Sequence, residues 1–291
     1  MKNHEHEIIG VLQLINAIDP ETGAVGEFSL ADQQLAESLA SQASVALTNR
    51  LLVCQLEVLF ESFINLINLA IDEKSPYTGG HCQRVPELTM MLAEAAATIA
   101  GPQIRNVATY GGNICNGATS ADSAAPTVAL EAELEIAGPD GTRRIPIAGF
   151  HTGPGKVALQ PAEILVAFHF APDSHPHVGS HYFKYAMRGA MDIATIGCAA
   201  YCQIEDGHFK TLRLAYGVAA PTPVRTPHAE AAAEGQPLTR ATLAAIAEAV
   251  VADVAPRSSW RAEKEFRLHL IKTLAQRVIA CAVERAGGKI L

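Results

Sequence analysis

The chain of 291 residues has few charged residues, few aromatic residues and a single tryptophan. Charged residues make up 18% of the sequence and aromatic residues 5%, whereas hydrophobic residues make up 49%. This balance excludes a wholly disordered chain and is enough for one large or two ordinary domains with a core. An excess of basic residues is also absent, because 22 Lys and Arg against 30 Asp and Glu give a net charge of −8. That charge argues against a protein that binds nucleic acid.

Long apolar runs are missing as well. No stretch of about 18 apolar residues is without a charge, so we expect no transmembrane helix and no membrane partner. The first ten residues, MKNHEHEIIG, carry acidic residues where an export signal would carry basic ones. We therefore expect no export signal and a cytoplasmic protein.

The six cysteines form no C-x-x-C pair. They are scattered over the whole chain, which is typical of free thiols in a reducing cytoplasm. The one close pair, Cys198 and Cys202, lies in an apolar run at a spacing that does not suit an iron–sulfur cluster or a zinc site. If this protein moves electrons, its carrier is organic, or a partner protein holds the metals.

The N-terminal third has a strand-like beginning and a long helical pattern. Residues 8–15 form an apolar run that predicts a strand, and residues 19–23 predict a turn. Ser29 or Asp32 is suited to cap a helix, and apolar residues then recur at helical spacing from Leu35 to Ile71. We expect one long helix or two in series, so that residues 1–96 form a mainly helical segment with one orphan strand.

The rest of the chain mixes strands and helices. The Asp140–Gly141 turn predicts a hairpin over residues 134–147, and residues 163–168 predict another strand. Further strands are expected near residues 181–187, 194–203 and 212–218, followed by helices over 243–254 and 266–283. The sequence therefore predicts an α+β fold that ends in a small three-stranded domain backed by helices.

Residues 106–126, NVATYGGNICNGATSADSAAP, are the best candidates for a binding site. Adjacent Gly111 and Gly112 permit positive φ and a close approach of the backbone to a ligand, and successive N–H groups of such a turn suit a pyrophosphate. Thr109, Asn113 and Ser120 add hydrogen-bonding groups, and Asp122 is suited to accept from ribityl or ribose hydroxyls. A glycine pair alone mostly marks a tight turn. The combination of the glycine pair with the Ser-x-Asp pattern of Ser120 and Asp122 is more specific for a binding site.

This segment resembles the second flavin-contacting segment of the FAD-binding subunits of bacterial three-subunit xanthine dehydrogenases. The resemblance continues to the end of the chain through five segments: GFHTGPGK (149–156), EILVAFHF (163–170), HYFKYAMRGAMDIATIGCAAY (181–201), GVAAPTPVR (217–225) and APRSSWRAEKEFRLHLI (255–271). It implies the second half of a flavin-binding domain of the vanillyl-alcohol-oxidase type over residues 97–176. A C-terminal domain of the CO dehydrogenase/xanthine dehydrogenase flavoprotein type would follow over residues 177–291.

The resemblance also implies eight FAD-binding residues, and it implies neither a catalytic side chain nor a metal ligand in this chain. Residues 109–113 would wrap the phosphates and the ribityl chain, Asp122 would hydrogen-bond the cofactor, Leu165 would pack near it, and Lys184 would approach the flavin ring. Arg188 and Asp192 would form either a loop over the ring or a structural ion pair. The eight residues are Thr109, Tyr110, Gly111, Gly112, Asn113, Asp122, Leu165 and Lys184.

The family's activity gives the expected partners. Hypoxanthine and xanthine would be oxidised at a molybdenum-binding subunit, and electrons would pass through a 2Fe–2S subunit to FAD and then to NAD⁺. An earlier flavin loop of the family, a strand followed by Gly-Gly-Thr or Gly-Asn-Thr, is missing from this sequence. The one candidate, at residues 78–80, follows Ser-Pro-Tyr and precedes a helix, which is the wrong context. The resemblance therefore implies impaired flavin binding.

The first part of the chain resembles two other protein families, both of them signalling proteins. Residues 10–52 are similar to the last strand and closing helix of a GAF sensory domain, and residues 70–96 to the first helices of an HD-GYP phosphodiesterase. In that family the histidine at position 81 can ligate a metal. However, the sequence contains no His-Asp dipeptide and no Gly-Tyr-Pro, so a catalytic metal pair is not expected.

The two resemblances meet near residues 95–99, which indicates a chimera in which other residues replace the N-terminal part of a flavin subunit. The first hypothesis is thus an FAD-dependent oxidoreductase subunit. The alternative is a fragment of a GAF/HD-GYP signalling regulator that associates with itself through residues 31–70. A non-functional chimera is the third possibility.

Overall fold

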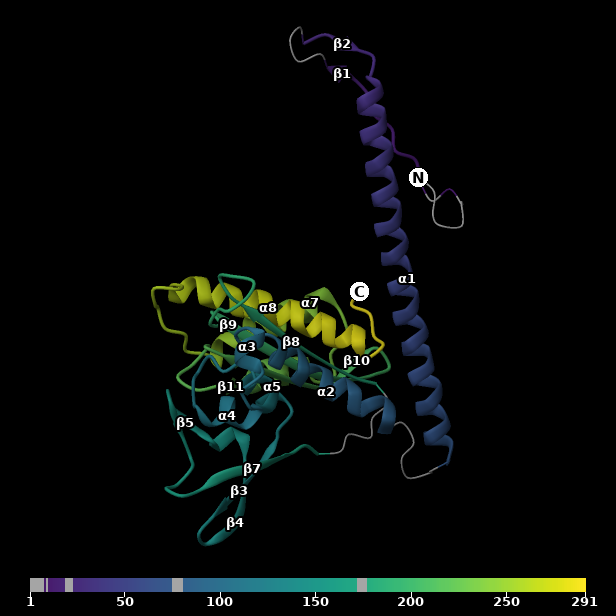
Figure 1. The fold of residues 1–291 in the computed structure, drawn as a ribbon. Helices are drawn as coiled ribbons and strands as arrows, with labels where there is room; N and C mark the ends of the chain where they lie inside the picture. The colour runs from purple at the N-terminus through teal and green to yellow at the C-terminus, as the bar shows by residue number, and fades with distance from the viewer. Residues whose placement is uncertain (1–7, 9, 19–22, 75–80, 172–176) are drawn as a thin grey trace. The chain divides into compact units, whose positions relative to one another are not determined.

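A computed structural model describes residues 8, 10–18, 23–74, 81–171 and 177–291 (Figure 1). Along residues 63–74 and 81–88, and at positions 54, 57, 58, 60 and 61, only the backbone is described. The chain forms two compact units, residues 1–74 and residues 75–291.

The first unit is built on one long helix. The helix α1 spans Leu30–Lys74, and the short antiparallel strands β1 (Ala17–Ile18) and β2 (Val25–Gly26) precede it. Its N-terminus is capped as predicted, because the Asp32 backbone N–H donates to Ser29 Oγ over 3.2 Å and the Ser29 N–H donates to Asp32 Oδ2 over 3.0 Å.

The predicted strand over residues 8–15 is wrong, since residues 10–16 form no strand. A strand needs a partner, and in the described part of this unit the named strands pair residues 17–18 with residues 25–26.

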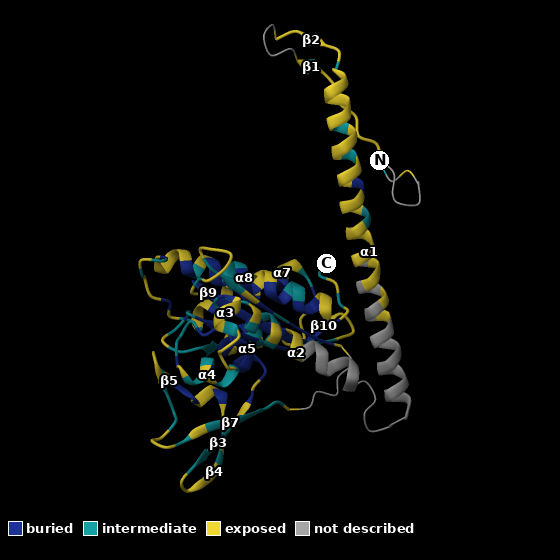
Figure 2. Ribbon diagram, viewed as in Figure 1, coloured by how far each residue is buried: buried dark blue, intermediate teal, exposed yellow. Residues whose placement is uncertain are grey.

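Many large apolar side chains of α1 are exposed, and Figure 2 shows most of the described part of this helix in the colour of exposed residues. They lie on more than one side of the helix and are Leu30, Leu35, Leu39, Val45, Leu47, Leu51, Leu52, Val53, Leu56 and Leu59. Exposed apolar surface of this extent is normally covered by other protein. No described helix is long and apolar enough to cross a membrane.

The second unit begins with helices and a small sheet. The helices are α2 (His81–Ala97), α3 (Pro102–Arg105), α4 (Tyr110–Cys115) and α5 (Ala124–Ala129). The strands β3 (Glu133–Gly138) and β4 (Gly141–Pro146) form the predicted hairpin, and β7 (Ile164–His169) completes a sheet of order β4-β3-β7. Gly141 has φ +114°, a conformation that the Asp-Gly turn requires. Strands β5 (His151–Gly153) and β6 (Lys156–Val157) pair separately, after the short 3₁₀ helix η1 (Ile147–Gly149).

The C-terminal part contains a four-stranded antiparallel sheet of order β11-β10-β9-β8. Three of its strands lie where the sequence predicted them: β8 (Val178–Tyr185), β9 (Ile196–Glu205) and β10 (His208–Gly217). The prediction of three strands is wrong because β11 (Val224–Arg225) was missed. It has two residues, which is too short for any alternation to show in the sequence. The helices α6 (Pro227–Ala233), α7 (Arg240–Ala249) and α8 (Lys264–Arg285) follow, with the 3₁₀ helix η2 (Val250–Ala252) after α7.

This sheet is buried on both faces. Alternate residues of β9 belong to two cores: Cys198 and Cys202 pack with residues of α8, whereas Ala199 and Tyr201 pack with residues of α2 and α5. Residues 196–202 of β9 are all buried, and so are nine residues of α8. Strand β9 therefore reads as a continuous apolar run rather than as an alternating one.

Helix α8 lies directly on β8. A Cβ atom on Gly179 would stand 2.0 Å from the carbonyl oxygen of Ala282, so only glycine permits this approach. The two buried thiols of β9 face the same helix, and burial raises the pKa of Cys198 and of Cys202 to about 12. Both cysteines are inert core residues at neutral pH.

Candidate functional site

The glycine pair at positions 111 and 112 does not form a turn, contrary to the sequence prediction. It lies inside α4, and neither glycine has a positive φ. Thr109 caps this helix in an extended conformation, φ −119° and ψ 152°, and its Oγ1 accepts from the Gly112 N–H over 2.9 Å. The capping hydroxyl makes the helix more favourable than the turn at this place.

Both glycines still serve a purpose in α4. A Cβ on Gly112 would lie 2.9 Å from Thr109 Oγ1 and would displace the cap, whereas one on Gly111 would lie 3.8 Å from the side chain of Leu165. Gly112 therefore leaves room for the Thr109 cap, and Gly111 lets Leu165 pack against the start of the helix. The structure also brings Leu165 of β7 beside Gly111, so two of the predicted site residues are neighbours.

The side chains of Tyr110 and Asn113 face the protein. The Tyr110 hydroxyl contacts Thr127 Oγ1 and donates to the Ser123 carbonyl oxygen over 3.2 Å, and burial raises its pKa to about 12. Asn113 Oδ1 accepts from the hydroxyl of Ser123. These contacts tie α4 to the beginning of α5, so both side chains position the segment.

Asp122 and Lys184, predicted separately, form a buried ion pair. Lys184 Nζ lies 2.8 Å from Asp122 Oδ2, and both side chains are 8% exposed. The Tyr182 hydroxyl donates to Asp122 Oδ1 over 2.9 Å, and Lys184 Nζ also donates to the Thr98 carbonyl oxygen over 2.9 Å. Burial raises the pKa of the Asp122 carboxyl, because loss of hydration outweighs the nearby ammonium. Both carboxylate oxygens of Asp122 thus have partners within the protein.

Neither Tyr182 nor Thr98 was singled out from the sequence. Tyr182 and Lys184 are separated by one residue on β8, so their side chains point to the same side of the strand. That spacing is a usable signal for Tyr182 once the strand is known. Thr98 contributes its backbone carbonyl oxygen, which every residue type has, so the sequence gives no signal for this contact.

Lys184 lies at a cavity of about 750 Å³ between residues 97–105 and the loop that follows β8. Asp192 holds this loop: its Oδ2 accepts from the Arg188 N–H over 3.0 Å, and its Oδ1 accepts from the Ile193 N–H over 2.9 Å. The guanidinium of Arg188 lies 3.8 Å from Asp192 Oδ1. Of the two possibilities left open by the sequence, the structure shows the ion pair, within a loop that lines the cavity.

The two halves of the candidate site are joined without a gap. Asn113 of α4 bonds to Ser123, the neighbouring Asp122 pairs with Lys184, and Lys184 reaches the cavity. An exposed helix start at one end and a cavity with a buried ammonium at the other suit an elongated ligand that has phosphates and a large ring system.

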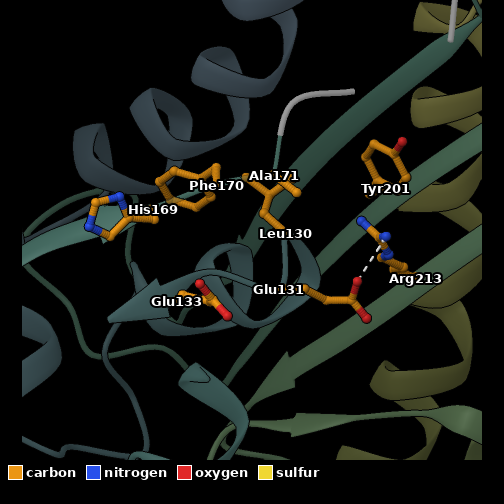
Figure 3. Close-up of a pocket in the computed structure, with 8 residues that line it drawn as sticks. All are labelled: Leu130, Glu131, Glu133, His169, Phe170, Ala171, Tyr201 and Arg213. Carbon is orange, nitrogen blue, oxygen red and sulfur yellow. Dashed lines mark ion pairs between the residues drawn. The ribbon is translucent and has the colours of Figure 1, made fainter. Parts of the chain in front are cut away.

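A second cavity, of about 300 Å³, lies elsewhere in this unit and contains none of the predicted site residues (Figure 3). Arg213 and Glu131, which face each other there, form an ion pair of 2.8 Å. The guanidinium of Arg213 also lies 4.9 Å from the ring centre of Tyr201. Because none of the predicted residues line it, we assign this cavity no part in the candidate site.

Comparison with known proteins identifies the family. Residues 73–172 match the FAD binding domain in molybdopterin dehydrogenase, and residues 181–282 match the CO dehydrogenase flavoprotein C-terminal domain. The chain is 67% identical over 199 residues to the xanthine dehydrogenase FAD-binding subunit of Escherichia coli O157:H7. The aligned residues make up 68% of each of the two chains. It belongs to the FAD-binding subunits of the xanthine dehydrogenase-type molybdenum hydroxylases.

More distant relatives agree with this assignment. The chain is 31% identical over 197 residues to the carbon monoxide dehydrogenase medium chain of Hydrogenophaga pseudoflava, covering 68% of each protein. A solved structure of carbon monoxide dehydrogenase from the same organism superimposes with a TM-score of 0.64 at 33% identity, over 67% of each chain. The chain is therefore an oxidoreductase subunit whose cofactor is FAD, as predicted. The resemblances to GAF and HD-GYP proteins stay predictions, as do the domain boundaries at 96/97 and 176/177.

The residues that are present fit FAD. Thr109 and Gly112 at the start of α4 are exposed, and the cavity beside Lys184 is large enough for a ring system. The individual contacts predicted for Thr109, Tyr110, Gly111, Gly112, Asn113, Asp122, Leu165 and Lys184 stay predictions.

Proposed function

We propose that this chain is the FAD-binding subunit of a molybdenum-containing xanthine dehydrogenase, in the cytoplasm, serving purine catabolism. A molybdenum-binding subunit and a 2Fe–2S subunit would be its partners, and NAD⁺ the final electron acceptor. The observation that carries the proposal is the buried Asp122–Lys184 pair, which lies between the α4 segment and the cavity in a chain 67% identical to a xanthine dehydrogenase flavin subunit.

Each residue then has a definite task. Backbone N–H groups at the start of α4 other than those of Gly112 and Asn113, which donate to Thr109, bind phosphate oxygens, and Leu165 covers one side of that segment. Lys184 supplies a positive charge to the cavity, and Asp122 and the Thr98 carbonyl fix the position of that charge. FAD, when bound, accepts electrons from one partner and passes them to another.

The first flavin loop of the family is missing from this sequence. Residues 78–80, the sequence's one candidate for it, lie outside the described residues. We propose that the chain binds FAD more weakly than its relatives, because one of the two segments that hold the pyrophosphate is absent.

The visible absorption spectrum tests the proposal. The full chain is incubated with FAD, excess is removed, and NADH is then added without oxygen. A retained flavin spectrum that NADH bleaches supports the function. A chain that binds no FAD even in equilibrium dialysis against excess FAD overturns it, with the E. coli FAD-binding subunit serving as the positive control.

One observation favours a second function, self-association through residues 31–70. Among the side chains of α1 that the structure describes, ten large apolar ones between Leu30 and Leu59 are exposed, and burying such surface drives association. Self-association would also accompany a chimera that has no flavin, so the two functions are tested separately.

A further inference from the structure

Arg267, in the first turn of α8, is a buried cation whose partners are all neutral. Only 3% of its surface is exposed, and its guanidinium donates to the carbonyl oxygens of Thr195 and Ala262 and, over 2.9 Å, to the hydroxyl of Ser259. No carboxylate in the described parts of the chain forms an ion pair with it. A buried charge is costly unless an opposite charge compensates it, so an anion would stabilise this group.

Two more arginines lie close to Arg267. Burial and the positive charges of Arg257 and Arg261 lower the pKa of the Arg267 guanidinium. Arg261 is also linked to it through Ser259, whose hydroxyl oxygen accepts from the Arg261 backbone N–H over 3.3 Å and from Arg267. Among the described residues, neither Arg257 nor Arg261 has an ion-pair partner. Like charges therefore gather in one place in a chain whose net charge is −8.

Two buried polar atoms at this place have no hydrogen-bond partner in the part of the chain that the structure describes. They are Arg261 Nε and the hydroxyl oxygen of Thr195. The Arg261 guanidinium stacks on the ring of Trp260 at 4.1 Å, which orients it but offers no acceptor for its N–H groups. Thr195 is 1% exposed, and its own carbonyl oxygen accepts from Arg267. Buried polar atoms are nearly always hydrogen-bonded, and an exception can mark the place of an ion.

The acidic residues of the same segment do not neutralise the arginines. Glu263, the N-cap of α8, and Glu265, in its first turn, are both exposed, and neither has an ion-pair partner among the described residues. The beginning of this 22-residue helix adds partial positive charge of its own. The surroundings of Arg267 therefore favour an anion.

We propose that Arg257, Arg261 and Arg267 bind an oxyanion that carries a phosphate group. Guanidinium groups bind phosphate oxygens through pairs of N–H donors, and several of them together favour a doubly charged phosphate over a carboxylate. The described hydrogen bonds use part of the donors of Arg267 and none of the guanidinium donors of Arg257 and Arg261. Arg257 is exposed and Arg261 partly exposed, so an anion reaches them from solvent. None of the three arginines lines the Lys184 cavity, so this site stands whether or not the chain binds FAD.

Equilibrium dialysis of the full chain against labelled inorganic phosphate, at constant ionic strength, tests the site. We expect saturable binding that Arg261→Gln weakens by roughly tenfold and that Arg261→Gln with Arg257→Gln weakens further. Arg240→Gln removes an exposed arginine at the start of α7, so it is the matched control and should keep the wild-type affinity within about twofold. Trp260 is the single tryptophan, and its fluorescence should change over the same range of phosphate concentration.

A phosphate ester distinguishes the two sources of the phosphate group. Tighter binding of glycerol phosphate than of inorganic phosphate assigns the site to a phosphorylated molecule, and the reverse assigns it to the free ion. Binding that does not saturate, or a response that sodium chloride reproduces at equal ionic strength, overturns the proposal. Wild-type affinity in both the single and the double variant overturns it as well.

The same dialysis with FAD present separates this site from the flavin site. FAD equimolar with the chain should leave the affinity for phosphate unchanged, because the arginines lie outside the residues that line the Lys184 cavity. Displacement of phosphate by FAD would assign these arginines to the flavin and overturn a separate site. A chain that binds phosphate but no FAD supports the arginine site and refutes the flavin function, so the two failures are distinguishable.

Discussion

The ammonium group of Lys184 lies 2.8 Å from Asp122 Oδ2, with both side chains almost entirely out of contact with solvent. Asp122 precedes α5, and Lys184 lies on β8, so the pair joins the flavin-binding segment to the C-terminal sheet. Burying two charges is costly, and removing either partner leaves the other without compensation. A pair kept in such a place beside a cavity is typical of a functional site.

Lys184→Met is therefore expected to lower the free energy of unfolding by about 3 kcal/mol, because Asp122 would keep a buried carboxyl without its cation. Urea unfolding followed by near-UV circular dichroism measures this change. Lys210→Met, which removes a surface pair of 3.1 Å with Glu205, is the control and changes stability by less than about 1 kcal/mol. Combining Lys184→Met with Asp122→Asn should cost less than the sum of the two, and strict additivity would contradict the coupling.

Gly112→Ala tests the α4 segment. The new Cβ displaces the Thr109 cap, which costs about 1 kcal/mol, while alanine's better helix propensity returns a similar amount. We expect nearly unchanged stability and roughly tenfold weaker FAD retention, measured by equilibrium dialysis. Gly149→Ala is the matched control, since a Cβ there meets nothing within 4 Å and φ is not positive. Equal FAD retention in both variants would remove α4 from the site.

Stability is expected to fall as the pH drops below about 6.5, partly because of His151. Burial lowers the pKa of this histidine from its ordinary value of 6.5, and its Nε2 lies 3.3 Å from the Ile114 carbonyl oxygen at the end of α4. The unfolded chain therefore binds a proton that the folded chain does not, and stability is lost from pH 6.5 down to the folded pKa. His151→Gln should reduce the slope of melting temperature against pH between about pH 6.5 and pH 5. An unchanged slope would contradict this assignment, with the exposed His208→Gln as control.

Self-association through α1 can be tested by placing a charged side chain at an exposed leucine of this helix. Leu39→Lys and Leu52→Lys each place an ammonium where an exposed leucine now stands, so we expect sedimentation velocity to show a smaller species than the wild type. Gln42→Lys, on the same helix, is the control, because it adds the same charge without removing apolar surface. A monomeric wild-type chain, or oligomers unaffected by both leucine substitutions, would exclude association through this helix.

The sequence predicted much of the fold because its signals are local. The Asp-Gly hairpin, the Ser29 cap and the three longer strands of the C-terminal sheet all follow from short patterns. The strand expected over residues 8–15 was wrong because apolar residues form a strand only where a partner strand is available. Strand β11 was missed because two residues are too few to show the alternation of apolar and polar residues that is typical of a strand.

The site was predictable in its members but not in its geometry. Resemblance gave Asp122 and Lys184 separately, yet their direct contact depends on how α5 and β8 pack, which no short pattern encodes. The conformation of Gly111 and Gly112 was also not predictable from a short pattern. A glycine pair alone favours a turn, whereas here the Thr109 hydroxyl caps the chain and stabilises a helix. Contacts through backbone carbonyls, such as that of Thr98, are independent of residue type.

The burial of the C-terminal sheet on both faces has a consequence for how residues 75–291 unfold. Ala199 and Tyr201 complete the core of the flavin-binding half, while Cys198 and Cys202, on the same strand, complete the core under α8. Neither half can lose its order without exposing the other's interior to water. The two halves should therefore melt in one cooperative transition, and separate expression of either half should yield an insoluble product.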